Sequence, residues 1–113
     1  LASPIFFYGV TAQAKRMIDR CQTLWARKYV LGEPSLQGHS AKRKGWFISV
    51  AGSRGEKVFQ GAILTARYFF DALDVVYAGE LVFRRIDTRG AIGQHPTALK
   101  DAFEAGLRLV RPH

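Results

Sequence analysis

The chain has 113 residues, of which 48% are hydrophobic and 23% charged, and its formal net charge is +8. This length allows a single domain with one core. No apolar run approaches the ~18 residues of a membrane helix, which excludes a membrane-spanning function. The apolar start lacks the preceding basic region of a signal peptide. The single cysteine, Cys21, cannot form an internal disulfide, so we expect a reducing compartment and a cytoplasmic protein.

The basic balance raises two alternatives for the densest cationic run, residues 42–44. It is either a solvated loop or a contact for a phosphate or a dinucleotide. A basic module that binds nucleic acid is a further alternative. It is disfavoured because the sequence shows neither a basic helix face nor an aromatic–basic RNA motif.

The first 44 residues predict a strand end, a helix and a loop. Residues 1–3 resemble the last turn of a strand. Thr11 is a candidate N-cap, and apolar residues at helical spacing predict a helix over about residues 11–28. Residues 29–44 contain glycine, proline and the basic run, which indicates a connecting loop.

The rest of the chain alternates between strand and helix patterns. The apolar run in residues 45–53, GWFISVAGS, is typical of a strand covered on both faces in a parallel sheet. The elements expected after it are a turn at SRGEK, a helix over 58–73, a strand over 74–86, a loop over 87–94 and a helix that begins at Pro96 and ends before Pro112.

This order predicts βαβ units and a parallel sheet with helices on both faces. A sheet of two strands and a stub would leave a long apolar edge unpaired. We therefore expect residues 1–113 to be the C-terminal part of a longer domain.

Ligands of open α/β sheets bind beyond the carboxyl ends of the strands, which selects the loops at residues 3–11, 51–57 and 86–95. The first loop combines aromatic residues with a helix N-terminus, and would suit a flat heterocycle that accepts hydrogen bonds. Simple packing of these aromatic residues at a strand end is the alternative. The second loop, AGSRGE, resembles a backbone cradle for an anion or a ring edge.

Other candidates for chemistry are weak. The three histidines, His39, His95 and His113, have no metal-ligand spacing, and His95 is interpreted as a helix-capping residue. Cys21 is expected to be buried and inert. The acidic pair Asp71 and Asp74 is expected to be solvated. We predict no catalytic side chain and no metal site.

The motif SPIFFYGVTAQAKRMIDR, residues 3–20, resembles the loop and helix after the third strand in the NAD(P)H-dependent FMN reductase family of flavodoxin-like proteins, which includes iron–sulfur flavoproteins. The family pattern is S-P-[IV]-Y, then a helix with A/G-Q-x-K and a later I-D-R. The matching residues are Ser3, Pro4, Ile5, Gln13, Lys15, Ile18, Asp19 and Arg20. AGSRGEKVFQG, YAGELVFRRIDTRGAI and HPTALKDAFEAGLRLV resemble later segments of the family in the same order.

The resemblance implies a flavodoxin-like doubly wound parallel sheet, of which this chain is the part from the end of strand 3 through the last helix. It also implies that the N-terminal strands and the phosphate-binding loop lie outside residues 1–113. The residues that it implicates in FMN binding are Pro4, Ile5, Phe6, Phe7, Tyr8 and Gly9, and Ala51, Gly52, Ser53, Arg54 and Gly55. Phe6 replaces the usual tyrosine, so its hydroxyl contact is lost unless Tyr8 substitutes.

The implied activity is that of an FMN-dependent NAD(P)H oxidoreductase of the flavin or quinone reductase type. FMN is the implied cofactor and NAD(P)H the implied co-substrate. The acceptor would be a quinone, a flavin or a redox protein, and a homodimer or homotetramer is implied. The alternative within the fold is an electron-transfer or iron–sulfur flavoprotein that acts with a protein partner. The sequence does not distinguish NADH from NADPH.

Overall fold

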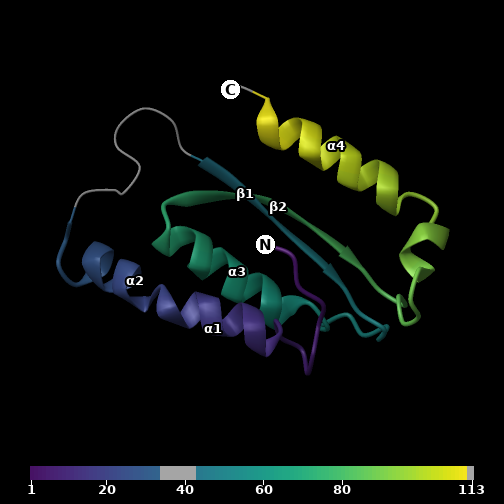
Figure 1. The fold of residues 1–113 in the computed structure, drawn as a ribbon, viewed down its shortest axis with the longest axis horizontal. Helices are drawn as coiled ribbons and strands as arrows, with labels where there is room; N and C mark the ends of the chain where they lie inside the picture. The colour runs from purple at the N-terminus through teal and green to yellow at the C-terminus, as the bar shows by residue number, and fades with distance from the viewer. Residues whose placement is uncertain (34–42, 112–113) are drawn as a thin grey trace.

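A computed structural model describes residues 1–33 and 43–111, which form a small parallel sheet with helices on both sides (Figure 1). The elements, in chain order, are α1 (Ala12–Arg20), α2 (Gln22–Tyr29), β1 (Arg43–Val50), α3 (Gln60–Ala72), β2 (Val75–Phe83), the 3₁₀ helix η1 (Ala91–Gln94) and α4 (Ala98–Val110). The predicted alternation of strands and helices is confirmed. Lys42, His39, Pro112 and His113, on which some expectations fell, lie outside the described residues.

The two strands pair in parallel, from Arg43 opposite Val75 to Val50 opposite Phe83. Residues 1–5 extend the sheet on the other side of β1. The Ser3 N–H donates to the Ile48 carbonyl at 3.1 Å, and the Ile48 N–H donates to the Leu1 carbonyl at 2.9 Å. The expectation that residues 1–3 form the end of a strand is therefore confirmed.

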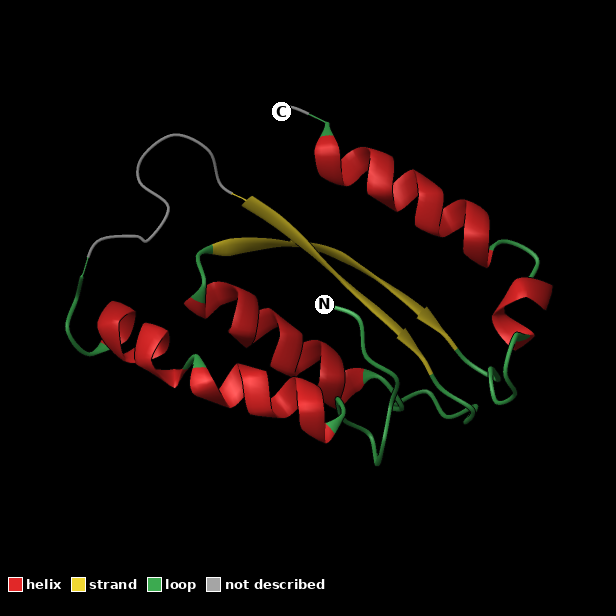
Figure 2. Ribbon diagram, viewed as in Figure 1, coloured by secondary structure: helices red, strands yellow, loops and turns green. Residues whose placement is uncertain are grey.

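Helices α1, α2 and α3 lie on one side of the strands and α4 lies on the other (Figure 2). The core is on the α3 side, where Phe47 of β1 packs against Ala62 and Ala66, all three with no exposed surface. On the α4 side, Ala98 and Ala105 are buried, yet Ile48 keeps 42% of its surface exposed. The expectation that this strand is covered on both faces is wrong, because α4 covers only part of its face.

The predicted helix over residues 11–28 is interrupted at Cys21. The Cys21 N–H bonds to the Ile18 carbonyl, three residues back, and ψ of Cys21 is 6°. This is the spacing of a 3₁₀ turn, which ends α1 and gives α2 a new direction. Neither helix contains a fully buried residue.

The last helix begins two residues later than predicted. Pro96 precedes the N-cap residue Thr97, and α4 starts at Ala98. The reason is His95, whose Nδ1 accepts from the N–H groups of Thr97 and Ala98 at 3.2 and 3.1 Å. These N–H groups would otherwise lack a partner at the start of the helix. The interpretation of His95 as a capping residue is confirmed.

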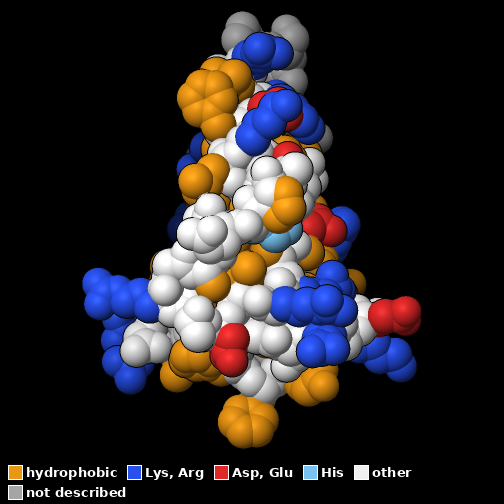
Figure 3. All heavy atoms as spheres, turned by 90° about the vertical axis from the view of Figure 1, so that its right-hand side faces the viewer, with side chains coloured by type: hydrophobic (Ala, Val, Ile, Leu, Met, Phe, Trp, Pro, Cys, Tyr) orange, Lys and Arg blue, Asp and Glu red, His pale blue; other side chains and the backbone are white. Residues whose placement is uncertain are grey.

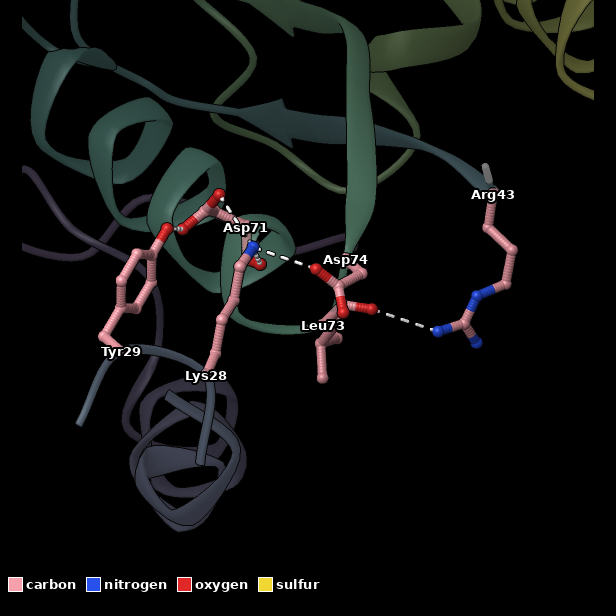
Figure 4. Close-up of polar contacts among 6 residues, drawn as sticks. All are labelled: Lys28, Tyr29, Arg43, Asp71, Leu73 and Asp74. Atoms are coloured by element: carbon pink, nitrogen blue, oxygen red, sulfur yellow. Dashed lines mark hydrogen bonds and ion pairs between the residues drawn. The ribbon is translucent and has the colours of Figure 1, made fainter. Parts of the chain in front are cut away.

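At the amino end of the strands, one lysine ties α2 to the turn between α3 and β2 (Figure 4). Lys28 Nζ lies 2.9 Å from an Asp74 carboxylate oxygen, and it donates to the Asp71 carbonyl at 2.8 Å. The hydroxyl of Tyr29 donates to the Asp71 carboxylate. The expectation that Asp71 and Asp74 are merely solvated is wrong, because both bind a cation from another helix.

In the part of the chain that the structure describes, no helix is long and apolar enough to cross a bilayer.

Candidate functional site

Three segments meet at the carboxyl end of the strands, at the right of Figure 1. They are residues 3–11, residues 51–59 and residues 84–95, close to the three loops selected from the sequence. Figure 3 faces this end and shows a hydrophobic side chain projecting at its lowest point, with Lys and Arg side chains on both flanks. The surface therefore combines apolar and cationic groups.

The first segment is fixed by hydrogen bonds at both of its ends. The Ile5 N–H donates to the Val50 carbonyl at 3.1 Å, which continues the pairing with β1. Buried Ser3 accepts from the Thr11 N–H at 3.0 Å through its hydroxyl oxygen. Thr11 then caps α1 by accepting from the Ala14 N–H at 3.2 Å, as predicted. The residues between Ile5 and Thr11 are thereby forced into a short loop.

Within this loop, residues 6–9 form a two-residue hairpin, called the aromatic hairpin below. Phe6 and Gly9 exchange both backbone hydrogen bonds, at 3.0 and 3.2 Å. Phe7 and Tyr8, at the turn, have φ of 50° and 65°. Two positive φ values are what a type I′ turn requires, and asparagine and glycine usually occupy these positions. Bulky residues there cost about 1–2 kcal/mol each.

The strained turn presents its rings to solvent. Phe7 is fully exposed, and Phe6 and Tyr8 are 62% and 61% exposed. Packing at a strand end, the alternative interpretation of these residues, therefore does not describe their environment. A backbone held in a rare conformation with exposed aromatic rings is a feature that clusters at binding sites.

Gly61, in the first turn of α3, packs directly against the backbone of the aromatic hairpin. A Cβ at this position would lie 2.8 Å from the Tyr8 carbonyl oxygen, closer than van der Waals contact permits. Only glycine lets this backbone approach the helix so closely. This role of Gly61 was not predicted, because nothing near it in the sequence indicates the contact.

The second segment contains the glycine-rich loop, residues 52–57, all of which are exposed. In the described part of the chain, the backbone N–H groups of these six residues have no hydrogen-bond partner. They are available as donors to a ligand or to water. That they form the cradle predicted for AGSRGE stays a prediction.

Arg84, just beyond β2, fixes the glycine-rich loop from the third segment. Its guanidinium donates to the Gly55 carbonyl at 3.0 Å and to the Glu56 carbonyl at 3.1 Å. It also lies 5.1 Å from the centre of the Phe59 ring. Next to it, the Asp87 carboxylate lies against Gly52, 2.8 Å from where a Cβ would be. Arg84 and Asp87 were not predicted, although the polar run RRID directly after a strand is a signal for them.

The predicted site residues divide into two groups. Ile5 and Ala51 are partly or fully buried and pack with Val58 and Phe59, so they support the loops from beneath. The others lie exposed or partly exposed on the loops, namely Pro4, Phe6, Phe7, Tyr8, Gly9, Gly52, Ser53, Arg54 and Gly55. The structure brings both predicted loops to one end of the sheet. Among residues 1–33 and 43–111, no group of His, Cys, Asp and Glu could hold a metal ion.

A groove of about 290 Å³ lies apart from these loops, between α3 and the pair α1–α2. Its lining includes Cys21, Trp25, Tyr68 and Phe69 and none of the predicted site residues. Cys21 is half-buried there, so the expectation of a fully buried thiol is wrong.

The fold is mixed α/β with parallel strands, and it is consistent with part of a flavodoxin-like sheet. One solved structure that it resembles is described as Trp repressor binding protein from Bacillus subtilis. The match has a TM-score of 0.64 and 23% sequence identity, and it covers 98% of this chain. The chain spans 66% of the length of that structure. At this identity the likeness concerns the fold. No family model and no curated protein matches the chain.

Proposed function

We propose that residues 1–113 form part of an FMN-dependent NAD(P)H oxidoreductase of the flavin or quinone reductase type. The observation that carries the proposal is the aromatic hairpin, residues 6–9, which exposes three rings at the same end of the sheet as a loop with free backbone donors. A flat heterocycle with carbonyl and ring-nitrogen acceptors complements this combination. The likeness to the solved structure supports the proposal only through the fold, that is, through parallel strands with loops beyond their carboxyl ends.

The residues present are assigned to the ring of FMN. Phe6, Phe7 and Tyr8 would contact the ring, and the N–H groups of residues 52–55 would donate to its polar edge. Ile5 and Ala51 hold the two loops in place from the core. When bound, the flavin supplies the hydride or electron transfer, and the protein positions it. No side chain is required to act as acid or base.

The test of ring binding uses riboflavin, which has the ring of FMN but no phosphate. We expect saturable quenching of riboflavin fluorescence by the purified chain, and Phe7→Ala should weaken binding about fivefold or more through the lost stacking. Tyr68→Ala is the matched control, because this exposed aromatic residue lies on α3, outside the loops. Absence of quenching, or an equal loss in both variants, would contradict the proposal.

The reaction type needs a separate assay. A reductase oxidises NAD(P)H with a quinone or a free flavin as acceptor. An electron-transfer flavoprotein passes electrons only to a protein acceptor, so turnover with the small acceptors distinguishes the two functions.

A further inference from the structure

The aromatic hairpin is an uncharged tip at the carboxyl end of the sheet. Residues 1–14 contain no charged side chain, and Phe7, at the turn, is fully exposed. The hairpin is closed by its own backbone, since Phe6 and Gly9 exchange both of their hydrogen bonds. Such a tip can enter the headgroup region of a lipid bilayer without burying a charge.

The segments next to the hairpin are strongly cationic. Residues 51–59 and 84–97 contain five basic side chains and two acidic ones, an excess of three positive charges. Arg84 donates to two carbonyls of the glycine-rich loop. The other four basic residues are exposed, and their side chains have no hydrogen bond or ion pair within residues 1–33 and 43–111. These four are Arg54, Lys57, Arg85 and Arg89.

Backbone contacts connect the cationic segments to the hairpin. The Tyr8 carbonyl oxygen lies against Gly61 in the first turn of α3. The first N–H of α3 donates to the Lys57 carbonyl at 3.2 Å, so the glycine-rich loop leads directly to this contact. The Arg85 N–H donates to the Ser53 carbonyl at 3.4 Å, which joins the segment after β2 to the same loop.

The apolar tip lies beyond the cations. In Figure 1 the purple segment that contains the hairpin reaches the lowest point of this end of the molecule. In Figure 3, which is turned about the vertical axis, a hydrophobic side chain projects at the lowest point, and Lys and Arg side chains lie above it on both flanks. This is the order that a bilayer surface requires, with rings deepest and cations at the level of the lipid phosphates.

We propose that the aromatic hairpin docks on the surface of an anionic lipid bilayer, with Phe7 inserted among the headgroups. Aromatic side chains are favoured at the interface between membrane and water. Lys and Arg near the surface are attracted to anionic lipids, and they need only lie on one side of the protein rather than converge on one point. The docking is peripheral and requires no cofactor, so it does not rest on the proposed function.

A nucleic acid is the other polyanion that a basic surface with aromatic residues attracts. Single strands usually lie in a positively charged groove whose aromatic residues stack on the bases. The groove of about 290 Å³ between α3 and the pair α1–α2 is lined by aromatic residues but by no Lys or Arg. At the hairpin a hydrophobic side chain projects instead of lining a groove. The geometry therefore favours a lipid surface.

The test is sedimentation of the purified chain with vesicles, in the absence of flavin. One set of vesicles is phosphatidylcholine alone, and the other contains about 30% phosphatidylserine. We expect the anionic vesicles to bind about tenfold more tightly. Phe7→Ala should lower this affinity about fivefold or more, because its exposed ring no longer inserts. Tyr68→Ala, an exposed aromatic residue on α3, is the control and should change the affinity less than about twofold.

The cations and the insertion are tested separately. Lys57→Gln and Arg89→Gln should each lower the affinity for anionic vesicles about fivefold. Arg20→Gln removes the same charge from the last turn of α1, and we expect a change of less than about twofold. In Phe7→Trp, contact with anionic vesicles should shift the tryptophan emission to shorter wavelength, beyond any shift of the original chain.

Absence of binding, equal binding to both sets of vesicles, or an equal loss in Phe7→Ala and Tyr68→Ala would overturn the inference. A single-stranded DNA oligonucleotide that prevents vesicle binding, and that itself binds Phe7→Ala more weakly, would assign the hairpin to nucleic acid instead. Riboflavin binding is measured without vesicles, and vesicle binding without flavin. Vesicle binding without riboflavin quenching therefore counts only against the reductase, and the reverse result counts only against the docking.

Discussion

Tyr8 holds a left-handed conformation, φ 65°, that an ordinary side chain adopts only at a cost in free energy. Its ring is 61% exposed, so packing does not offset this cost. We interpret the conformation as maintained for ligand contact, at the expense of stability.

Replacement of this tyrosine by glycine should therefore stabilise the fold. We expect Tyr8→Gly to raise the free energy of unfolding by about 0.5–1 kcal/mol, because the left-handed strain exceeds the extra chain entropy of glycine. The same variant should bind riboflavin more weakly. Urea denaturation measures the first effect and fluorescence titration the second. In Tyr68→Gly, the same change within α3 should lower stability by about 1 kcal/mol. A loss of stability in both variants would show that Tyr8 is not strained.

At the scale of elements, the aromatic hairpin packs closely on α3 because Gly61 has no Cβ. We expect Gly61→Ala to lower the free energy of unfolding by about 1–3 kcal/mol, since the new Cβ meets the Tyr8 carbonyl oxygen at 2.8 Å. Displacement of the hairpin should also weaken riboflavin binding. Thermal denaturation and titration measure these effects.

A second helical glycine provides the control for Gly61. At Gly106 in α4 a Cβ would meet nothing within 4 Å, so Gly106→Ala should stabilise the chain by about 0.5–1 kcal/mol. If both variants are stabilised, the hairpin is not seated on α3 as described.

The attachment of α2 depends on Lys28. The hydrogen bond with Asp74, and next those with Asp71, raise the pKa of Lys28 above 10.5 despite partial burial. The stabilisation is complete below pH 10.5 and is lost as the pH rises through the folded-state pKa. Lys28→Met should lower the free energy of unfolding by about 1 kcal/mol at pH 7. The difference from the original chain should shrink above pH 10.5.

Lys15→Met is the control for this effect, because its ion pair with Asp19 joins two exposed residues of one helix at 2.8 Å. We expect a loss of about 0.3–0.5 kcal/mol there. Urea denaturation at neutral and alkaline pH measures both variants. A Lys28→Met effect that is the same at every pH would show that the charged contact of Lys28 with Asp74 does not stabilise the fold.

At the scale of the whole molecule, the sequence predicted the order of the elements because helical and strand periodicity are local signals. It also predicted that the two candidate loops share one end, since this follows from parallel strands. It could not predict the contact of Gly61 with Tyr8 or that of Lys28 with Asp74. These join residues 53 and 46 positions apart, and only the packed chain brings them together. The left-handed turn at Phe7 and Tyr8 could not be predicted either, because the conformational preferences of these residues disfavour it.

Some apolar residues whose helical spacing predicts burial lie exposed on the surface. Leu99, Phe103 and Val110 fall on one side of α4 and are 66%, 69% and 77% exposed. Their spacing predicts a packed face, but α4 contacts the strands through its alanines instead. The apolar spacing thus predicted the helix correctly, but it wrongly predicted that these three residues are buried.

The 113-residue chain should lack bound flavin after purification. The resemblance to the flavin reductases implies that the phosphate-binding loop lies outside residues 1–113, and under the proposed function much of the affinity for FMN would be lost with it. We therefore expect FMN to dissociate during gel filtration, leaving no absorbance near the flavin bands. Flavin retained at a stoichiometric level would contradict this expectation, and would indicate that the loops described above suffice for tight binding.

Cys21 offers a single labelling position between the helices. It is the single thiol of the chain, and it lies half-buried in the groove where α1 and α2 meet α3. A maleimide fluorophore would therefore label one position without further engineering. Its emission would report whether ligand binding at the aromatic hairpin, at the far end of α1, changes the separation of these helices.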